Sequence, residues 1–253
     1  MKRKTISYLI ILALLLIVLI VIQSQTEIQY YEGELSDTTD YTFDPYTILS
    51  SLGRESTDIF ALAPTEPENG WTSLAAPGTF NWNQRDYFRI ANVIHQHVWG
   101  SSLKEWQLIR ALFSVYQCHD ITNRIDQVVF SFYGKENNSY VVHGIRINPL
   151  EGIVTTGQDY FNYKGKRIKL DEVKLSSFDS ALLVAEQNGG REARLRANNE
   201  CSIGALLAPY VLPVYLNQFD WGWNIDYSDK NLEIIFNINI DPYTGDHYIL
   251  PTD

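Results

Sequence analysis

Hydrophobic residues form one nearly unbroken block near the start of the chain and later recur in shorter periodic runs. The block runs from Ile6 to Ile22, and only two of its 17 residues are polar or amphipathic. A helix of this length would span about 25 Å, which is just enough to cross a bilayer. The basic cluster Lys2–Lys4 precedes the block, and the positive-inside rule keeps such a cluster in the cytoplasm. The pattern predicts an uncleaved signal anchor, a single transmembrane helix within residues 1–23.

Two alternatives to the anchor stay open, a cleaved signal peptide and a buried helix of a soluble domain. A cleavage site needs small residues after the apolar core, whereas Ile22 is followed by Gln-Ser-Gln. We therefore expect a single-pass protein of the cell membrane, with a cytoplasmic N-terminus and a C-terminal domain outside the cytoplasm.

The remaining chain divides into an irregular part and a periodic part. Residues 24–83 are polar or rich in Pro and Gly, and they read as a linker and irregular wrapping segment. From Gln84 to Gly100 apolar residues recur every three or four positions, which predicts a helix. A capping box at Ser102-Leu103-Lys104-Glu105 followed by the stripe Trp106 to Tyr116 predicts a second helix. Alternating residues over 128–133 and 141–148 then predict two strands.

The same order follows in the C-terminal third of the chain. A helix is expected from Ser176 or Ser177 to Gly189-Gly190, where Gly can end it, and strands are expected over 221–227 and 232–240. The segments Ile147–Gly152 and Ile240–Gly245 share the pattern apolar, Asx, Pro, two free positions, Gly, which is typical of a hairpin turn. The fold class expected is α+β, an N-terminal transmembrane helix followed by two helix-plus-antiparallel-sheet units at 84–163 and 164–253.

Three segments of the second unit carry a family resemblance. They are Phe178-Asp179-Ser180-Ala181-Leu182-Leu183-Val184-Ala185-Glu186-Gln187-Asn188-Gly189-Gly190, Trp223-Asn224-Ile225-Asp226-Tyr227 and Ile240-Asp241-Pro242-Tyr243-Thr244-Gly245-Asp246. This order of helix, strand and final turn resembles PepSY and PepSY-like domains of exported bacterial proteins, and residues 84–163 resemble a diverged copy. The resemblance implies a small α+β module outside the cytoplasm that binds or restrains other proteins, and it implies no catalytic residues.

Composition narrows the classes of partner. The chain has 20 Lys and Arg against 30 Asp and Glu, and three of the basic residues lie before residue 22, so the rest carries 17 − 30 = −13. Such a charge disfavours nucleic acid as a partner. The only cysteines, Cys118 and Cys201, would face a compartment where a disulfide persists. Sequence leaves open whether they pair or remain two buried free thiols.

Known catalytic and cofactor signatures are missing from the sequence. There is no G-x-S-x-G, P-loop, H-E-x-x-H or dinucleotide motif, and His95 and His97 would point about 200° apart on a helix. His143 reads as a core histidine, and Glu186 as a solvated charge. We expect no enzyme activity, no catalytic residue, no metal and no cofactor.

The residues most suited to a partner are aromatic. Trp221, Trp223, Tyr210 and Tyr215 are the candidates, although burial of the tryptophans would make them core residues. The function expected is non-catalytic binding of a protein or peptide at the cell surface. The alternatives are an exported hydrolase whose site is assembled from distant residues, and a small-ligand sensor.

Overall fold

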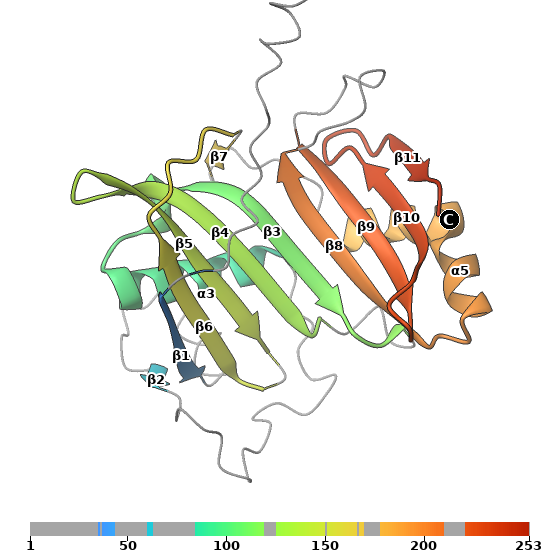
Figure 1. Cartoon of the computed structure of the whole chain (residues 1–253), viewed down its shortest axis with the longest axis horizontal. Helices are drawn as coiled ribbons and strands as arrows, with labels where there is room; N and C mark the ends of the chain where they lie inside the picture. Colours follow the sequence, from blue (N-terminus) through green and yellow to red (C-terminus); the bar gives the residue numbers. More distant parts are fainter. Residues whose placement is uncertain are drawn as a thin grey trace, which may run out of the picture.

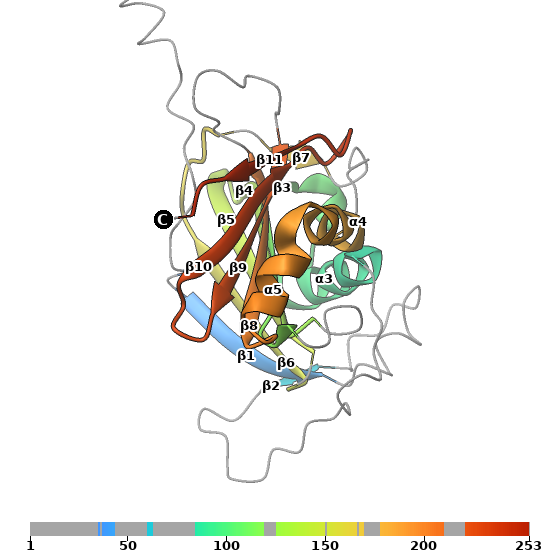
Figure 2. The ribbon, with the colours of Figure 1, turned by 90° about the vertical axis from the view of Figure 1, so that its right-hand side faces the viewer.

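The computed structural model describes residues 35, 37–43, 60–62, 84–118, 125–149, 151–165, 167–169, 178–209 and 221–252. These residues form one large antiparallel sheet with helices on one of its faces (Figures 1 and 2). The strands are β1 (Asp37–Phe43), β2 (Phe60–Leu62), β3 (Gln107–Val115), β4 (Gln127–Glu136), β5 (Ser139–Asn148), β6 (Ile153–Asp159), β7 (Ile168–Lys169), β8 (Cys201–Pro209), β9 (Trp221–Asp229), β10 (Ile234–Ile240) and β11 (His247–Leu250).

The strand order is β11-β10-β9-β8-β3-β4-β5-β6-β1-β2, and β7 pairs with β3 beside this path. All of the pairings are antiparallel, including the central one between β3 and β8. In that pairing Phe113 lies opposite Ala205 and Val115 opposite Ile203. Strands from the two predicted units therefore belong to one hydrogen-bonded sheet.

The expected architecture of a transmembrane helix followed by two helix-plus-sheet units is wrong. The molecule is mostly one continuous sheet, because β3 pairs with both β7 and β8 across the predicted boundary at residue 163. Among the described residues, no helix has both the length and the apolar character needed to cross a membrane. The membrane and signal-anchor assignments thus have no support, and the segment on which they rested, residues 1–23, lies outside the described residues.

Helices cover one face of the sheet in two groups. Helix α3 (Gln84–Trp99) lies behind the β3–β6 part (Figures 1 and 2). Helix α4 (Phe178–Ala185) lies behind the β8–β10 part, and after a π-helical turn (Glu186–Gly190) α5 (Arg191–Arg196) lies beside the β10 edge. Each group precedes a meander in the chain, β3 to β6 or β8 to β11. That the two halves are related repeats stays a prediction.

The predicted helix over 84–100 is confirmed, but the one predicted after Ser102 is wrong. Only a 3₁₀ turn, η1 (Leu103–Glu105), forms there, and β3 follows directly. A bulge between Leu108 and Arg110 shifts the alternation of β3 by one position. Residues 108 and 109 are both buried, and buried residues then alternate as in a strand, whereas Tyr116 of the expected helical stripe is exposed.

The predicted strands and glycine turns agree with the structure. The strands expected at 128–133, 141–148, 221–227 and 232–240 are confirmed as β4, β5, β9 and β10. Both matching turns place their glycine at positive φ, +64° at Gly152 and +78° at Gly245, a region that glycine enters without a Cβ penalty. Residues 24–83 are not irregular throughout, because β1 pairs with β6 and β2 pairs with β1.

The core lies between the sheet and the helices and is strongly aromatic. Phe113 of β3 stacks on Phe178 of α4 with centroids 5.3 Å apart, and it also contacts Trp223 of β9. Phe88 of α3 stacks on Phe130 of β4 at 4.6 Å. Since β3 contacts both groups, the apolar core runs continuously across the centre of the sheet.

Candidate functional site

The two tryptophans proposed for partner binding are core residues. Trp221 is 3% exposed and Trp223 is fully buried, and both face the helices from β9. Trp223 packs within 6.3 Å of the Phe178 ring. A partner could not reach either side chain on the folded protein. The other two candidates, Tyr210 and Tyr215, lie outside the described residues.

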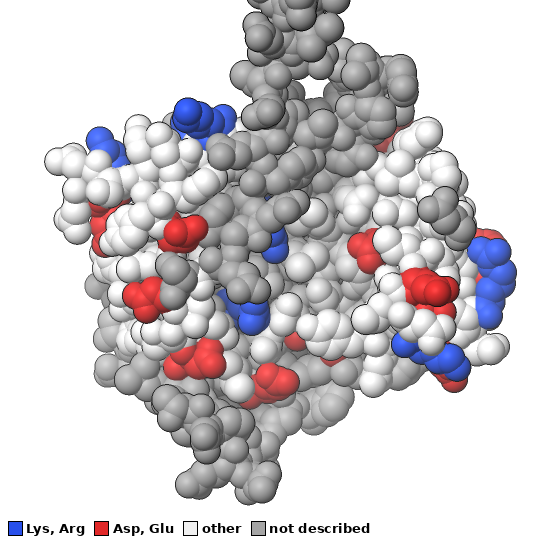
Figure 3. Space-filling view, viewed as in Figure 1, with Lys and Arg blue, Asp and Glu red and all other residues white. Residues whose placement is uncertain are grey.

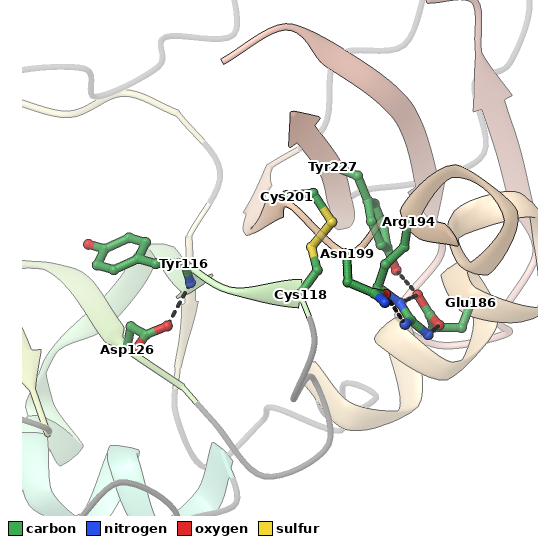
Figure 4. The surroundings of a disulfide bond; sticks show 8 residues. All are labelled: Tyr116, Cys118, Asp126, Glu186, Arg194, Asn199, Cys201 and Tyr227. Atoms are coloured by element: carbon green, nitrogen blue, oxygen red, sulfur yellow. Dashed lines mark hydrogen bonds and ion pairs between the residues drawn. A yellow bond between two sulfur atoms is a disulfide. The ribbon is translucent and has the colours of Figure 1, made fainter. Parts of the chain in front are cut away.

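Cys118 and Cys201 form a disulfide between the two halves of the sheet (Figure 4). Cys118 follows β3 and Cys201 begins β8, so the antiparallel pairing of these strands brings the two Cα atoms within 5.3 Å. The sequence left open whether the two cysteines pair or remain free thiols, and in the structure they are paired. It closes a chain separation of 83 residues beside the central strand pair.

A polar cluster lies next to the disulfide, on the inner side of α5 (Figure 4). The Tyr227 hydroxyl donates to Oε1 of Glu186 at 2.8 Å, and the Arg194 guanidinium pairs with Oε2 of Glu186 at 2.7 Å. Arg194 also donates to the Asn199 side-chain oxygen at 2.7 Å. Glu186, which sequence places in solvent, is instead largely buried and paired.

The surroundings of this cluster shift its titrations. Burial raises the pKa of Tyr227, and the neighbouring Glu186 carboxylate adds to the rise. The hydrogen bond to Glu186 raises the pKa of Arg194. Each group is therefore held in its bonded state at neutral pH, with Tyr227 neutral and Arg194 charged.

Glycine creates the backbone geometry that this cluster needs. Gly189 has φ +121°, so the helix that begins at Phe178 breaks at the glycines where the sequence predicts its end, and α5 follows directly after the kink. A Cβ on Gly190 would lie 2.7 Å from the Tyr227 hydroxyl oxygen. The cluster thus joins the π-helical turn, α5 and β9, and its hydrogen bonds are directed inward. We interpret it as a structural unit.

The second buried polar group is a pair of histidines. Nδ1 of His95 lies 2.8 Å from the Ser101 carbonyl oxygen, and Nε2 of His95 lies 2.9 Å from Nδ1 of His143. Nε2 of His143 lies 3.6 Å from Oε2 of Glu136. The His143 ring is stacked between two indoles, those of Trp99 at 4.0 Å and Trp106 at 4.2 Å.

This arrangement bears on the hydrolase alternative, for which a histidine close to a carboxylate would be the signature. His143 and Glu136 approach each other, but both histidines are fully buried. Burial lowers the pKa of His95 to about 4 and, together with the charge of His95, that of His143 to about 3. A substrate has no access to the ring, so the pair does not form an open acid–base site.

A groove of about 1130 Å³ lies at the β10–β11 edge of the sheet. Ala193 and Ala197, one turn apart on α5 and its C-cap, lie on one side of it. Ala193 is buried, whereas Ala197 is half-buried, and its short side chain leaves space that a larger residue would fill. Ile234 and Ile235 of β10 line the other side, and the chain from Leu250 to Thr252 lies at one end. We call this feature the edge groove.

The edge groove opens where strand pairing stops. The last ladder pair between β10 and β11 is Asn237 with Leu250, so β10 continues from Phe236 back to Ile234 beyond the end of β11. Ile234 is 49% exposed and Leu232, in the preceding hairpin, is 81% exposed. The ladder between β10 and β9 shifts register between Ile234 and Phe236, so this stretch is a bulged edge bordered by exposed aliphatic side chains.

Charged residues of both signs surround the edge groove. Arg196 and Lys230 are the basic ones, and Glu200, Asp229 and Glu233 are the acidic ones. Basic and acidic side chains alternate at this edge in Figure 3. Lys230 pairs with Glu200 at 3.3 Å, and Asp229 accepts hydrogen bonds from the backbone of Asn231 and Glu233. The backbone bond from Glu233 is the main cause that lowers the pKa of Asp229, which closes the hairpin as a carboxylate.

A shallower hollow of about 540 Å³ lies on the other side of the same hairpin. It shares Glu200, Asp229 and Lys230 with the edge groove, and it is lined by Tyr116, Leu232 and Cys201 as well. The exposed surface therefore continues from the edge groove over the hairpin to the disulfide.

Metal ligands do not gather in the part of the chain that the structure describes. No group of three or more His, Cys, Asp or Glu side chains there could hold an ion. The edge groove also lacks a sequence motif. Its signal in the sequence is the pair of alanines four residues apart, Ala193 and Ala197, at the end of a helix that is otherwise charged except for Leu195.

Comparison with known proteins adds no relative. No protein-family model matches the chain, and neither do any of the curated proteins or solved structures with which it was compared. The resemblance to PepSY-like domains stays a prediction.

Proposed function

We propose that this chain is a non-catalytic binding protein of an oxidising, extracytoplasmic compartment. Its ligand is an extended peptide segment of a partner protein, which adds as a strand beside β10 in the edge groove. The observation that carries the proposal is the stretch Ile234–Phe236, which extends beyond the end of β11 and carries the exposed Ile234 across the edge groove from Ala197.

Main-chain pairing would supply much of the affinity. An exposed strand edge presents N–H and C=O groups that an extended peptide can satisfy, and side chains next to the edge then select the sequence. The space beside Ala197 accepts an apolar side chain from the peptide. Ile234 offers a second apolar contact on the opposite wall.

The charges define the ligand further. Arg196 is exposed at the helix side of the edge groove, and Glu233 is exposed at the hairpin side. Lys230, Glu200 and Asp229 already bond within the molecule. We therefore expect a peptide with an acidic residue near Arg196 and a basic residue near Glu233, separated by apolar residues.

The disulfide supports the compartment. Disulfides persist outside the cytoplasm and are rare in reducing cytosol, and here the bond links the strands that join the two halves. The buried state of both histidines and the inward bonding of Glu186 support a binding role over a catalytic one.

Selection from a phage-displayed library of random peptides of about 12 residues, on the immobilised full-length protein, tests the proposal. An enriched peptide should show alternating apolar residues, and calorimetry on a synthetic copy should give a measurable Kd. Ala197→Trp, which fills the edge groove, and Ile234→Lys, which adds a charge to its wall, should each weaken binding about tenfold or more. Amides of Ile234–Phe236 should gain protection from hydrogen exchange.

Leu183→Lys is the matched control, because Leu183 is an exposed aliphatic residue of α4 that does not line the edge groove. Its affinity for the peptide should equal that of the wild type. Equal affinity of all three variants, or failure to enrich any peptide over the Ala197→Trp protein, would show that the edge groove is not a peptide site.

A further inference from the structure

We infer that His95, His143 and Glu136 form an acid-sensing site that takes up a single proton at Nε2 of His143. The site is independent of the edge groove, since it lies under α3 in the other half of the sheet. Its function is to hold α3 on β4 and β5 at neutral pH and to loosen that contact in acid.

The hydrogen bonds determine which nitrogens carry protons. The Ser101 carbonyl can only accept, so Nδ1 of His95 must donate to it. Nε2 of neutral His95 is then an acceptor, and Nδ1 of His143 must donate to it. Nε2 of His143 is the last nitrogen of this hydrogen-bonded series, and it carries a lone pair and no proton. Both rings are therefore Nδ1–H tautomers.

That last nitrogen is the entry point for a proton. It is buried and has no hydrogen-bond partner among the residues that the structure describes. The nearest charged group is the Glu136 carboxylate of β4, whose Oε2 lies 3.6 Å away and whose side chain is 35% exposed. Glu136 thus links solvent to the buried ring, and its charge favours an imidazolium there over one at His95.

The rings around His143 suit a cation in the same place. Trp99 and Trp106 lie nearly parallel to the imidazole, at interplanar angles of 10° and 22°. Indole faces attract positive charge, and the attraction increases where water is excluded. A proton on His143 would lie between two such faces and beside a carboxylate.

Other charged groups around the pair do not compete for this role. From α3 the facing titratable group is His95 itself, while His97 contacts the Tyr41 ring at 5.8 Å. From β4 it is Glu136, and Lys135 lies over the Tyr140 ring. The charged residues of η1, Lys104 and Glu105, are exposed, and the flanking residues of His143 on its own face of β5, Val141 and Ile145, are apolar.

Only one proton can enter readily. The ring centroids of the two histidines are 5.0 Å apart, so a second imidazolium would meet a like charge in a buried site. Desolvation opposes even the first proton and lowers the pKa of both rings. The lower pKa at His143 includes repulsion from a charged His95, and that charge is absent when the first proton enters. The Glu136 carboxylate at 3.6 Å then directs the first proton to His143. Because an unfolded histidine titrates near 6.5, the unfolded state binds more protons below that pH. Stability from this site is complete above about pH 6.5 and is lost as pH falls toward 4 and 3.

Nitrogen-15 NMR of the full-length protein with labelled histidine provides the test. At pH 7 we expect Nδ1–H tautomers for both His95 and His143, and on acidification the first protonation at Nε2 of His143. Glu136→Gln removes the carboxylate but keeps the shape, and it should lower the pH of that protonation by about one unit. Fluorescence of Trp99 and Trp106, isolated by Phe substitutions elsewhere, should change at the same pH.

His247→Gln is the control, because His247 is an exposed residue of the edge strand β11. It should leave the protonation of His143 unchanged. An Nε2–H tautomer at His143, protonation of both rings in one step, or the same protonation pH in Glu136→Gln would each overturn the inference. His143→Gln provides a second measurement, since it should flatten the loss of stability between pH 6.5 and 4.

Discussion

At the scale of single residues, Tyr227 joins the helix layer to the sheet. Its ring is buried on β9, and its hydroxyl donates to a carboxylate that is itself paired with Arg194. A hydrogen bond to a charged group contributes about 1.5–3 kcal/mol to the free energy of unfolding. When a buried carboxylate loses such a bond, its desolvation cost is no longer offset. The cluster is therefore sensitive to the loss of a single oxygen atom.

Tyr227→Phe removes that oxygen without changing the ring. We expect the free energy of unfolding to fall by about 1.5–3 kcal/mol in urea denaturation at pH 7, with an unchanged m-value. Tyr248→Phe on the exposed strand β11 should change it by less than about 0.5 kcal/mol. Equal stabilities of the two variants would mean that the Tyr227–Glu186 bond contributes nothing to folding.

At the scale of elements, the pairing of β3 with β8 determines the architecture. These strands come from different halves of the chain, and the disulfide closes their loop of 83 residues at the Val115–Ile203 end. In the chain-entropy account, a crosslink stabilises by restricting the unfolded chain, by an amount that grows slowly with loop length. For this separation the account gives about 4.5 kcal/mol.

Replacing both Cys118 and Cys201 with Ala should therefore lower the free energy of unfolding by about 2–5 kcal/mol. Urea denaturation followed by circular dichroism measures the change. The wild type in excess dithiothreitol should unfold at the same urea concentration as the double variant. A loss below about 1 kcal/mol would contradict this prediction. It would mean that residual β3–β8 contacts already restrict the unfolded chain without the disulfide, or that native-state strain offsets the stabilisation.

At the scale of the whole molecule, the continuous sheet implies that the two halves unfold together. Phe113 contacts Phe130 of one half and Trp223 of the other, and no solvent-exposed linker separates them within the described strands. The contrasting expectation, two separate helix-plus-sheet units, would allow each half to melt alone.

We expect a single transition on heating, with coincident curves for tryptophan fluorescence and far-ultraviolet circular dichroism. Calorimetric and van't Hoff enthalpies should agree. Phe113→Ala should shift the whole transition to lower temperature without splitting it, because the cavity affects both halves. Two separated transitions in the wild type would indicate independent halves.

The sequence by itself determined the elements whose pattern is local. Alternation over β4, β5, β9 and β10, the helical spacing of α3 and the glycine turns at Gly152 and Gly245 were all visible in short windows. Side-chain direction alternates along a strand whatever its partner, and a left-handed turn residue is needed wherever such a hairpin closes. These features therefore did not depend on distant residues.

Only the tertiary structure decided what depends on pairing between distant segments. It made β3 a bulged strand instead of a helix, joined β3 to β8, and brought together Cys118 with Cys201 and His95 with His143. It also buried Trp223 and opened the edge groove at the end of β11. The physical reason is that competition among all available packings sets the order of the strands, the burial of side chains and the point where a ladder ends. A local pattern carries no information about which distant segment will be the neighbour.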